Sequence, residues 1–253
     1  MRYPSIRAAA KALLPPAVYR RLQLARGRLT SWLGKDRIRF GNFRRLTPIS
    51  AEWGEDRGLS IDRHYIEQFL GMHSQDIRGH VLEIRDDTYV RRFGAGQVSK
   101  IDVLYPIDGN PRATIVADLS SADHIPSDTF DCIVLTQTLQ YIYDTAAVIR
   151  TLHRILRPGG VLLATFPGIS QSSRRKERWN NYWRFTTCSA ERVFADGFPA
   201  REISVSAYGN VLAAIAFLHG LATEELHPEE LEYADPDYEL LITVRAVKAS
   251  GAT

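Results

Sequence analysis

A chain of 253 residues, 45% of them apolar, can bury a full core, so its composition argues against a disordered protein and favours one domain with an appendage. It has only two cysteines, Cys132 and Cys188, which argues against a disulfide framework or a cysteine-based metal site and fits a reducing compartment. The apolar run at residues 8–14 is too short and too interrupted for a signal peptide or a membrane span. We therefore expect a cytoplasmic protein.

The net charge of +3 hides an uneven distribution. Residues 1–45, the basic arm, hold 12 Lys and Arg against the single acid Asp36, which leaves 20 basic and 28 acidic residues beyond them. Residues 17–33 combine Leu and Val with four arginines on one predicted helix, a pattern that suits an anionic membrane surface. The arm could instead pack on the acidic body, in the same molecule or in the neighbour of a homodimer. Nucleic acid is a further anionic partner, but we do not expect it here.

The remaining residues, 46–253, predict a single domain of alternating strands and helices. The expected strands are short, aliphatic and bounded by Gly, Pro, Asn or Asp: residues 79–84, 98–104, 113–119, 130–136, 161–166, 203–208 and 238–247. The expected helices have apolar residues at helical spacing: residues 60–71, 146–156, 193–194 with their neighbours, and 211–218. Asp144 is a predicted N-cap and Gly159 a predicted C′ residue. This order predicts an α/β fold with a Rossmann-like, seven-stranded, mostly parallel sheet, an antiparallel last strand and helices on both faces.

The middle of the chain carries the most specific pattern. Asp118-Leu119 follow the third strand, Phe130-Asp131 open the fourth, and Leu156-Arg157-Pro158-Gly159-Gly160 lead into the fifth. This segment resembles the second half of a class I S-adenosylmethionine (SAM) dependent methyltransferase of the type 11-like group. The resemblance implies an enzyme that uses SAM in a crevice at the carboxyl ends of the strands.

The segment after the first strand departs from that pattern. The family has an acidic residue followed by Gly-x-Gly-x-Gly, whose glycines let the backbone approach the amino acid portion of the cofactor. Here the residues are Glu83-Ile84-Arg85-Asp86-Asp87, with Arg85 at the first glycine position. The fingerprint G-x-G-x-x-G is also absent, which argues against a nicotinamide or flavin cofactor.

The resemblance also implies the remaining cofactor contacts. Asp102, with Val103, stands on the second strand, where the family has a carboxylate for the ribose hydroxyls. Asp118 and Leu119 correspond to the pair that holds the adenine. Gln137 and Thr138 follow the fourth strand and would line the cofactor. These three pairs of residues, together with Glu83, Ile84 and Arg85, make up the expected cofactor site.

Less formally, the whole chain resembles bacterial methyltransferase-like proteins found beside glycosyltransferases in polysaccharide or secondary-metabolite pathways. The stretches that carry this likeness lie at residues 57–67, 136–140, 182–186 and 208–212. They embed polar groups among aromatic ones, which suits a sugar or a sugar phosphate. The expected substrate-binding residues are Arg57, Arg63, Gln140, Tyr182, Trp183 and Arg184. The alternative is that the aromatic residues cover the core and the arginines pair with acids.

Methyl transfer to a hydroxyl often needs a general base. His64 is our preferred candidate, and Asp62, two residues earlier, is the other catalytic candidate. Nothing in the chain has the spacing of a metal site, a nucleophile elbow or a phosphate-binding P-loop.

These patterns lead to three hypotheses. The first is a SAM-dependent methyltransferase acting on a hydroxyl, or a similar group, of a saccharide or other small metabolite. The second is a protein of the same fold that no longer methylates and binds or transforms a nucleotide sugar or a phosphorylated sugar. The third is a scaffold whose basic arm recruits a glycosyltransferase complex at the inner face of the membrane.

Overall fold

The computed structural model describes residues 14–32, 41–94, 96–172 and 180–250. The chain divides into two compact units, residues 1–46 and 47–253. In the first unit α2 (Pro16–Trp32) is the helix expected within the basic arm, and η1 (Gly41–Phe43) is a short 3-10 turn. Leu33, at the end of the expected helix, lies outside the described residues. None of the helices in the described ranges has the length and apolarity needed to cross a membrane.

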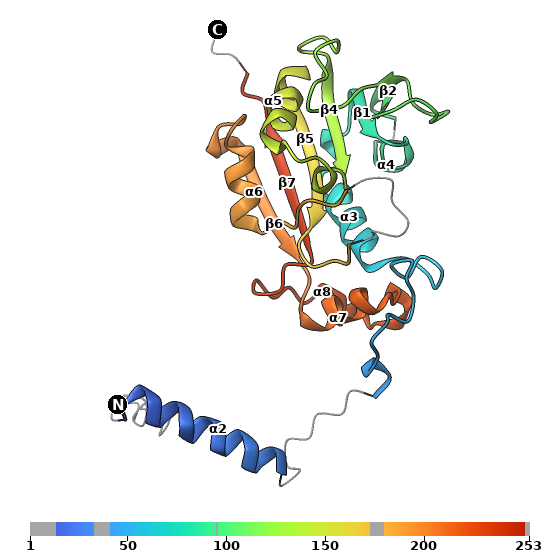
Figure 1. Ribbon diagram of the computed structural model, residues 1–253. Coiled ribbons are helices and arrows are strands. Elements are labelled where there is room, and N and C mark those ends of the chain that lie inside the picture. Colours follow the sequence, from blue (N-terminus) through green and yellow to red (C-terminus); the bar gives the residue numbers. More distant parts are fainter. Residues whose placement is uncertain (1–13, 33–40, 95, 173–179, 251–253) are drawn as a thin grey trace. The chain divides into compact units, whose positions relative to one another are not determined.

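The second unit is built on one sheet with the strand order β3-β2-β1-β4-β5-β7-β6 (Figure 1). Its strands are β1 (Gly79–Ile84), β2 (Val98–Tyr105), β3 (Ile115–Val116), β4 (Phe130–Thr136), β5 (Leu156–Pro167), β6 (Ile203–Tyr208) and β7 (Leu241–Val247). Strands β1 to β5 pair in parallel, and β7 pairs antiparallel with both β5 and β6. The predicted seven-stranded, mostly parallel sheet with an antiparallel last strand is confirmed.

Helices cover both faces of this sheet. In β4, Ile133 and Leu135 pack in the core cluster that holds α5 (Thr145–Ile155) and α6 (Thr187–Phe194). Cys132 and Val134 pack in the cluster that holds α3 (Ile61–Met72) and α7 (Val211–His219). Because neighbouring strand residues point to opposite faces, a continuous apolar run is what a doubly covered sheet requires.

The other helical elements are short: α4 (Thr88–Phe93), α8 (Pro228–Glu232), η2 (Ser74–Asp76), η3 (Leu139–Tyr141), η4 (Ala200–Glu202) and η5 (Thr223–Glu225). Helix α4 starts close after β1 and was not predicted. Among the six residues of α4, the structure buries Val90. A single buried residue gives no repeating apolar pattern from which a helix could be predicted.

The ends of α5 show one prediction that is confirmed and one that is wrong. Asp144 caps the helix, because its side chain accepts a hydrogen bond from the Ala147 N–H at 2.9 Å. Gly159 is not the C′ residue. The helix ends at Ile155, and Gly159 lies in β5, where its N–H donates to the carbonyl of Lys248 at 2.8 Å. Leu156 already adopts an extended conformation with a ψ of 142°, and Pro158 disfavours a helical conformation at Arg157, so the helix cannot reach Gly159.

Candidate functional site

Two neighbouring strands, β1 and β4, end at the same edge of the sheet and turn sharply there. Glu83 of β1 is in register with Val134 of β4, and the parallel pairing brings the residues that follow both strands to one edge. The first residue after each strand has a positive φ: 80° at Arg85 and 46° at Gln137. This conformation costs a residue with a side chain about 1–2 kcal/mol. Backbone strain of this kind gathers at functional sites, so this edge is the place to look for one.

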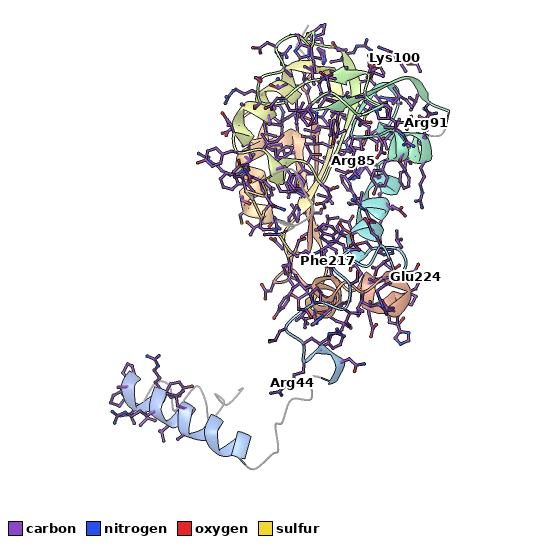
Figure 2. All side chains as sticks on the ribbon, turned by 45° about the vertical axis from the view of Figure 1, so that its right-hand side comes forward. Arg44, Arg85, Arg91, Lys100, Phe217 and Glu224 are labelled. Atoms are coloured by element: carbon purple, nitrogen blue, oxygen red, sulfur yellow. The ribbon has the colours of Figure 1, made fainter. Side chains whose placement is uncertain are left out.

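A cavity of about 380 Å³ lies at the ends of β1 and β2. It is lined by residues after β1 and around the end of β2: Arg85, Asp86, Tyr105, Ile107, Asp108, Gly109, Asn110, Pro111 and Arg112. The Asn110 side-chain amide donates to the carbonyl of Arg85 at 2.6 Å, and the Arg85 N–H donates to the carbonyl of Leu104 at 2.9 Å. The backbone of Arg85 is therefore held both by β2 and by a residue of the cavity lining, and Figure 2 labels Arg85 together with Arg91 of α4.

Glu83 fixes the segment between β1 and α4 that follows it in the chain. Its side chain is buried, and its carboxyl oxygens accept hydrogen bonds from the N–H groups of Tyr89 at 3.1 Å and Val90 at 2.8 Å. Burial raises the pKa of Glu83 to about 8, and the nearby Asp86 and Asp87 add to the shift, although the two N–H donors oppose it. Glu83 therefore holds the start of α4 and is largely protonated at neutral pH. Ile84 packs against the core cluster on the α5 face.

The structure does not bring Asp102 to the cavity. It lies three residues before the end of β2, and its carboxylate accepts hydrogen bonds from His80 Nε2 at 2.6 Å, Lys100 Nζ at 2.8 Å and Thr114 Oγ1 at 2.8 Å. Burial opposes ionisation, but these donors together lower the pKa of Asp102. The expected ribose-binding carboxylate is thus engaged within the sheet.

Asp108, which sequence reasoning missed, is the carboxylate that follows β2 and lines the cavity. Its signal in the sequence was the turn 106–111, which contains two prolines, a glycine and an asparagine directly after an aliphatic strand. Val103 lines a neighbouring cavity of about 470 Å³ instead.

The residues after β3 form a tight turn. Asp118 is exposed, and one of its oxygens accepts hydrogen bonds from the N–H and the hydroxyl of Ser120, both at 2.8 Å. Leu119 is buried in the core. The cavity lining does not include this pair, which was expected to hold the adenine.

Buried amide atoms without a partner lie at the end of β4. Gln140, on η3, is only 2% exposed, and its Nε2 donates to Oε1 of Gln137 at 3.1 Å. Within the described residues the other amide atoms, Gln137 Nε2 and Gln140 Oε1, are buried without a hydrogen-bond partner, as is the hydroxyl of Thr165 on β5. Unsatisfied buried polar groups are rare and point to a ligand or a water. Thr138 is satisfied, because its hydroxyl donates to the carbonyl of Thr136 at 2.9 Å.

Three exposed aromatic side chains, Tyr143, Tyr182 and Trp183, form what we call the aromatic platform. The ring centroids of Tyr143 and Trp183 stack 5.7 Å apart at 26°, and Tyr182 meets Tyr143 edge-on at 5.5 Å. The Trp183 Nε1–H donates to the carbonyl of Ile142 at 3.0 Å, and the Tyr182 N–H donates to the carbonyl of Gln140 at 2.8 Å. The platform therefore adjoins the unpaired amides, and Tyr143 is a member that sequence reasoning missed.

Two of the predicted substrate-binding arginines are engaged within the protein. Arg57 forms a two-point ion pair with Glu225, with its Nε 2.9 Å from Oε2. Arg184 donates to the carbonyls of Ser170 and Gln171, which ties the chain after β5 to the platform. Both arginines therefore support the shape of the loops.

The start of α3 connects to the loop that Glu83 organises. Asp62 accepts a hydrogen bond from the hydroxyl of Ser60 at 2.6 Å. Burial disfavours the charge of Arg63, but Asp62 and a hydrogen bond with Tyr89 of α4 outweigh it and raise the pKa of Arg63. His64 is half-buried and packs edge-on against Tyr65, with centroids 5.3 Å apart. The structure thus brings Arg63 to the β1 side, whereas His64 contacts a core residue.

Comparison with known protein families identifies the family to which the chain belongs. Residues 62–195, more than half of the chain, match the model of a family described as a methyltransferase domain. The chain belongs to this methyltransferase family. No curated protein sequence matches it significantly.

Two solved methyltransferase structures were found to be similar to this chain. Phosphoethanolamine N-methyltransferase 2 of Haemonchus contortus, solved with S-adenosyl-L-methionine, is 16% identical, with a TM-score of 0.50 over 83% of this chain and 55% of that one. A SAM-dependent methyltransferase from Mesorhizobium loti is 18% identical, with a TM-score of 0.48 over 74% of this chain and 97% of that one. The chain spans about half the length of the Haemonchus protein. At these identities the likeness is one of fold.

The groups at the edge of the methyltransferase sheet fit SAM in most respects. The cavity lies within the roughly 300–1,000 Å³ of small-molecule sites. Asp86 and Asp108 offer carboxylates for hydroxyl or ammonium groups, and Arg85 keeps the positive φ that a glycine would adopt. The guanidinium of Arg85 suits a cationic sulfonium poorly, as does that of Arg112, which also lines the cavity but lies 3.7 Å from Asp87.

Proposed function

We propose that this methyltransferase transfers the methyl group of SAM to a hydroxyl, or a similar group, of a saccharide or other small metabolite in polysaccharide or secondary-metabolite biosynthesis. The observation that carries the proposal is the pairing of two different surfaces at one edge of the sheet. The cavity after β1 and β2 carries charged and polar groups, and the aromatic platform adjoins the end of β4.

The cavity residues would hold the cofactor. Bound SAM supplies an electrophilic methyl group on a sulfonium. Asp108 would accept hydrogen bonds from the ribose hydroxyls, since Asp102 is engaged within the sheet. Glu83 keeps the loop and α4 in place, so that the backbone of Arg85 can line the cavity.

The platform and the amides would hold the acceptor. Exposed aromatic faces suit the apolar face of a sugar ring, and the unpaired amide atoms of Gln137 and Gln140 offer one donor and one acceptor for its hydroxyls. Positioning the acceptor in this way lowers the entropic part of the barrier.

Removal of the hydroxyl proton would fall to a base at the start of α3. Asp62 and His64 remain the candidates. The carboxylate of Asp62 accepts a hydrogen bond from the hydroxyl of Ser60. We propose His64 as the base, with Asp62 and Arg63 positioning the start of the helix. Replacing His64 with Gln should lower methyl transfer by roughly 10²-fold or more while leaving SAM affinity unchanged.

The second candidate function is binding or conversion of a nucleotide sugar or a phosphorylated sugar. Arg85 favours it, because a guanidinium in the cavity suits a phosphate. Calorimetric titration of the purified full chain with SAM, S-adenosylhomocysteine (SAH) and UDP-glucose separates the two candidates. Micromolar binding of SAM or SAH supports the methyltransferase, whereas binding of UDP-glucose alone supports the second candidate.

The basic arm is proposed to contact an anionic membrane surface or a glycosyltransferase partner. Its support is the excess of 12 basic residues over one acid in residues 1–45, together with the exposed Val18 and Leu22 of α2. Deleting residues 1–45 should abolish flotation with phosphatidylglycerol vesicles and leave SAM titration unchanged. Flotation that survives the deletion would remove the arm from this role.

A further inference from the structure

The guanidinium of Arg85 has no ion-pair partner within the described residues. Arg85 is exposed and lines the cavity at the end of β1. Its backbone N–H and carbonyl are both hydrogen-bonded, but across the described residues its side chain makes no ion pair or hydrogen bond. The positive charge is therefore open to whatever the cavity holds.

Each carboxyl group close to Arg85 in the sequence accepts a hydrogen bond from a group other than Arg85. Glu83 accepts hydrogen bonds from the N–H groups of Tyr89 and Val90. Its pKa of about 8 leaves its carboxyl group mostly uncharged at neutral pH. Asp86 accepts the N–H of Thr88 at 3.0 Å.

Asp87 serves two other arginines. It pairs with Arg91 at 2.5 Å and lies 3.7 Å from Arg112. Asp86 and Asp108 line the same cavity as Arg85, but neither forms an ion pair with it in the described part of the chain. The charge of Arg85 thus lies at the cavity and belongs to no ion-pair network among the described residues.

The backbone makes this placement costly, which argues that it serves a purpose. Arg85 has a φ of 80°, a conformation that glycine adopts without strain. A glycine here would relieve the strain and remove the charge together. A long cationic side chain at such a position is therefore a candidate functional residue.

We propose that Arg85 makes the cavity discriminate by charge, so that it binds the uncharged thioether of SAH in preference to the cationic sulfonium of SAM. This inference rests on the proposed methyltransferase function. The two ligands share the adenosine and the amino acid portion and differ by one methyl group and one positive charge. The ratio of their affinities therefore isolates the interaction between Arg85 and the charge on sulfur.

The test is calorimetric titration of the full chain with SAM and with SAH at 20 mM and 300 mM KCl. Arg85→Gln removes the charge and keeps a long polar side chain, whereas Arg85→Lys keeps the charge. Arg91→Gln is the matched control, because it removes the same charge from the next helix, where Arg91 pairs with Asp87. Thermal unfolding of each variant checks that it is folded.

The expected result is a fall in the ratio Kd(SAM)/Kd(SAH) of about three- to tenfold in Arg85→Gln at 20 mM KCl, with a smaller fall at 300 mM. Arg85→Lys and Arg91→Gln should keep the wild-type ratio. Binding of SAM that is detectable only in Arg85→Gln, and not in Arg85→Lys, also supports the inference.

Other outcomes overturn it and remain distinguishable from failure of the proposed function. An unchanged ratio in Arg85→Gln, with both ligands bound, overturns charge discrimination and leaves the methyltransferase standing. An equal decrease in the Kd values for SAM and SAH in Arg85→Gly, with no change in Arg85→Gln, shows that backbone strain and not charge controls binding. If folded wild-type and variant proteins bind neither ligand, the proposed function and the inference both fail.

Discussion

The two sides of the carboxyl edge of the sheet share one backbone feature and differ in their chemistry. After β1 and after β4 the first residue has a positive φ, so both strands turn away sharply. On the β1–β2 side the turn leads to charged groups around a cavity, including Arg85, Asp86 and Asp108. On the β4–β5 side it leads to unpaired amides and exposed aromatic rings. The same backbone conformation thus precedes a charged cavity on one side and an aromatic surface on the other.

This comparison predicts that the two sides fail independently. Changes on the β1–β2 side should alter the binding of SAM or SAH and leave the acceptor side unchanged. Changes on the β4–β5 side should do the reverse. A variant that changes SAM affinity and acceptor affinity by the same factor would show that the two sides are coupled.

The largest expected effect comes from Glu83→Ala. The N–H groups of Tyr89 and Val90 lose their buried acceptor, so the free energy of unfolding should fall by about 2–4 kcal/mol at pH 6. Urea denaturation measures the fall, and SAM affinity should be lost with it. A loss below about 0.5 kcal/mol would show that Glu83 does not hold the β1 side together.

The pH dependence of stability tests the same residue without removing its shape. The pKa of Glu83 is about 8 in the folded protein and near 4.5 when unfolded, so the native state binds the extra proton between these values. Stability from this group is therefore present at low pH and is lost as pH rises through 8. From pH 7 to pH 9 the wild type should lose about 1–2 kcal/mol more than Glu83→Gln. Parallel pH profiles for the two proteins would contradict the raised pKa.

On the acceptor side, Trp183→Ala removes one face of the aromatic platform. Binding to arrayed pyranose-containing saccharides should weaken about tenfold, as expected for the loss of an aromatic stacking face. Trp183→Phe should keep most of the binding, and the Kd for SAM should stay within twofold in both variants. Saccharide binding that is equal in wild type and Trp183→Ala would remove the platform from the site.

The smallest effect concerns the shared backbone feature. Gln137→Gly and Arg85→Gly each replace a residue at positive φ with the one that adopts it freely, so each should raise the free energy of unfolding by about 0.5–1 kcal/mol. Thermal or urea unfolding measures both. A gain at Arg85 but a loss at Gln137 would show that the Gln137 side chain, which pairs with Gln140, matters more than the strain.

The order of strands, the long helices and the family resemblance could all be predicted from the amino-acid sequence, whereas the short helix α4 could not. The continuous apolar run 132–135 favours a strand that is buried on both faces, and the N-cap Asp144 acts through its own helix. These signals depend on residues that are close in the sequence, so they can be interpreted without knowledge of distant contacts. The family resemblance also rested on a contiguous stretch, residues 117–168.

Only the tertiary structure decided which side chains meet at the site. Asp102 matched the expected type and strand, but His80, Lys100 and Thr114 engage it within the sheet, and Asp108 takes the place at the cavity. Tyr143 joined Trp183 across 40 residues of chain. Whether a charge is neutralised or left open, as at Arg85, depends on partners that folding brings from other strands and loops, and a linear pattern does not contain those distances.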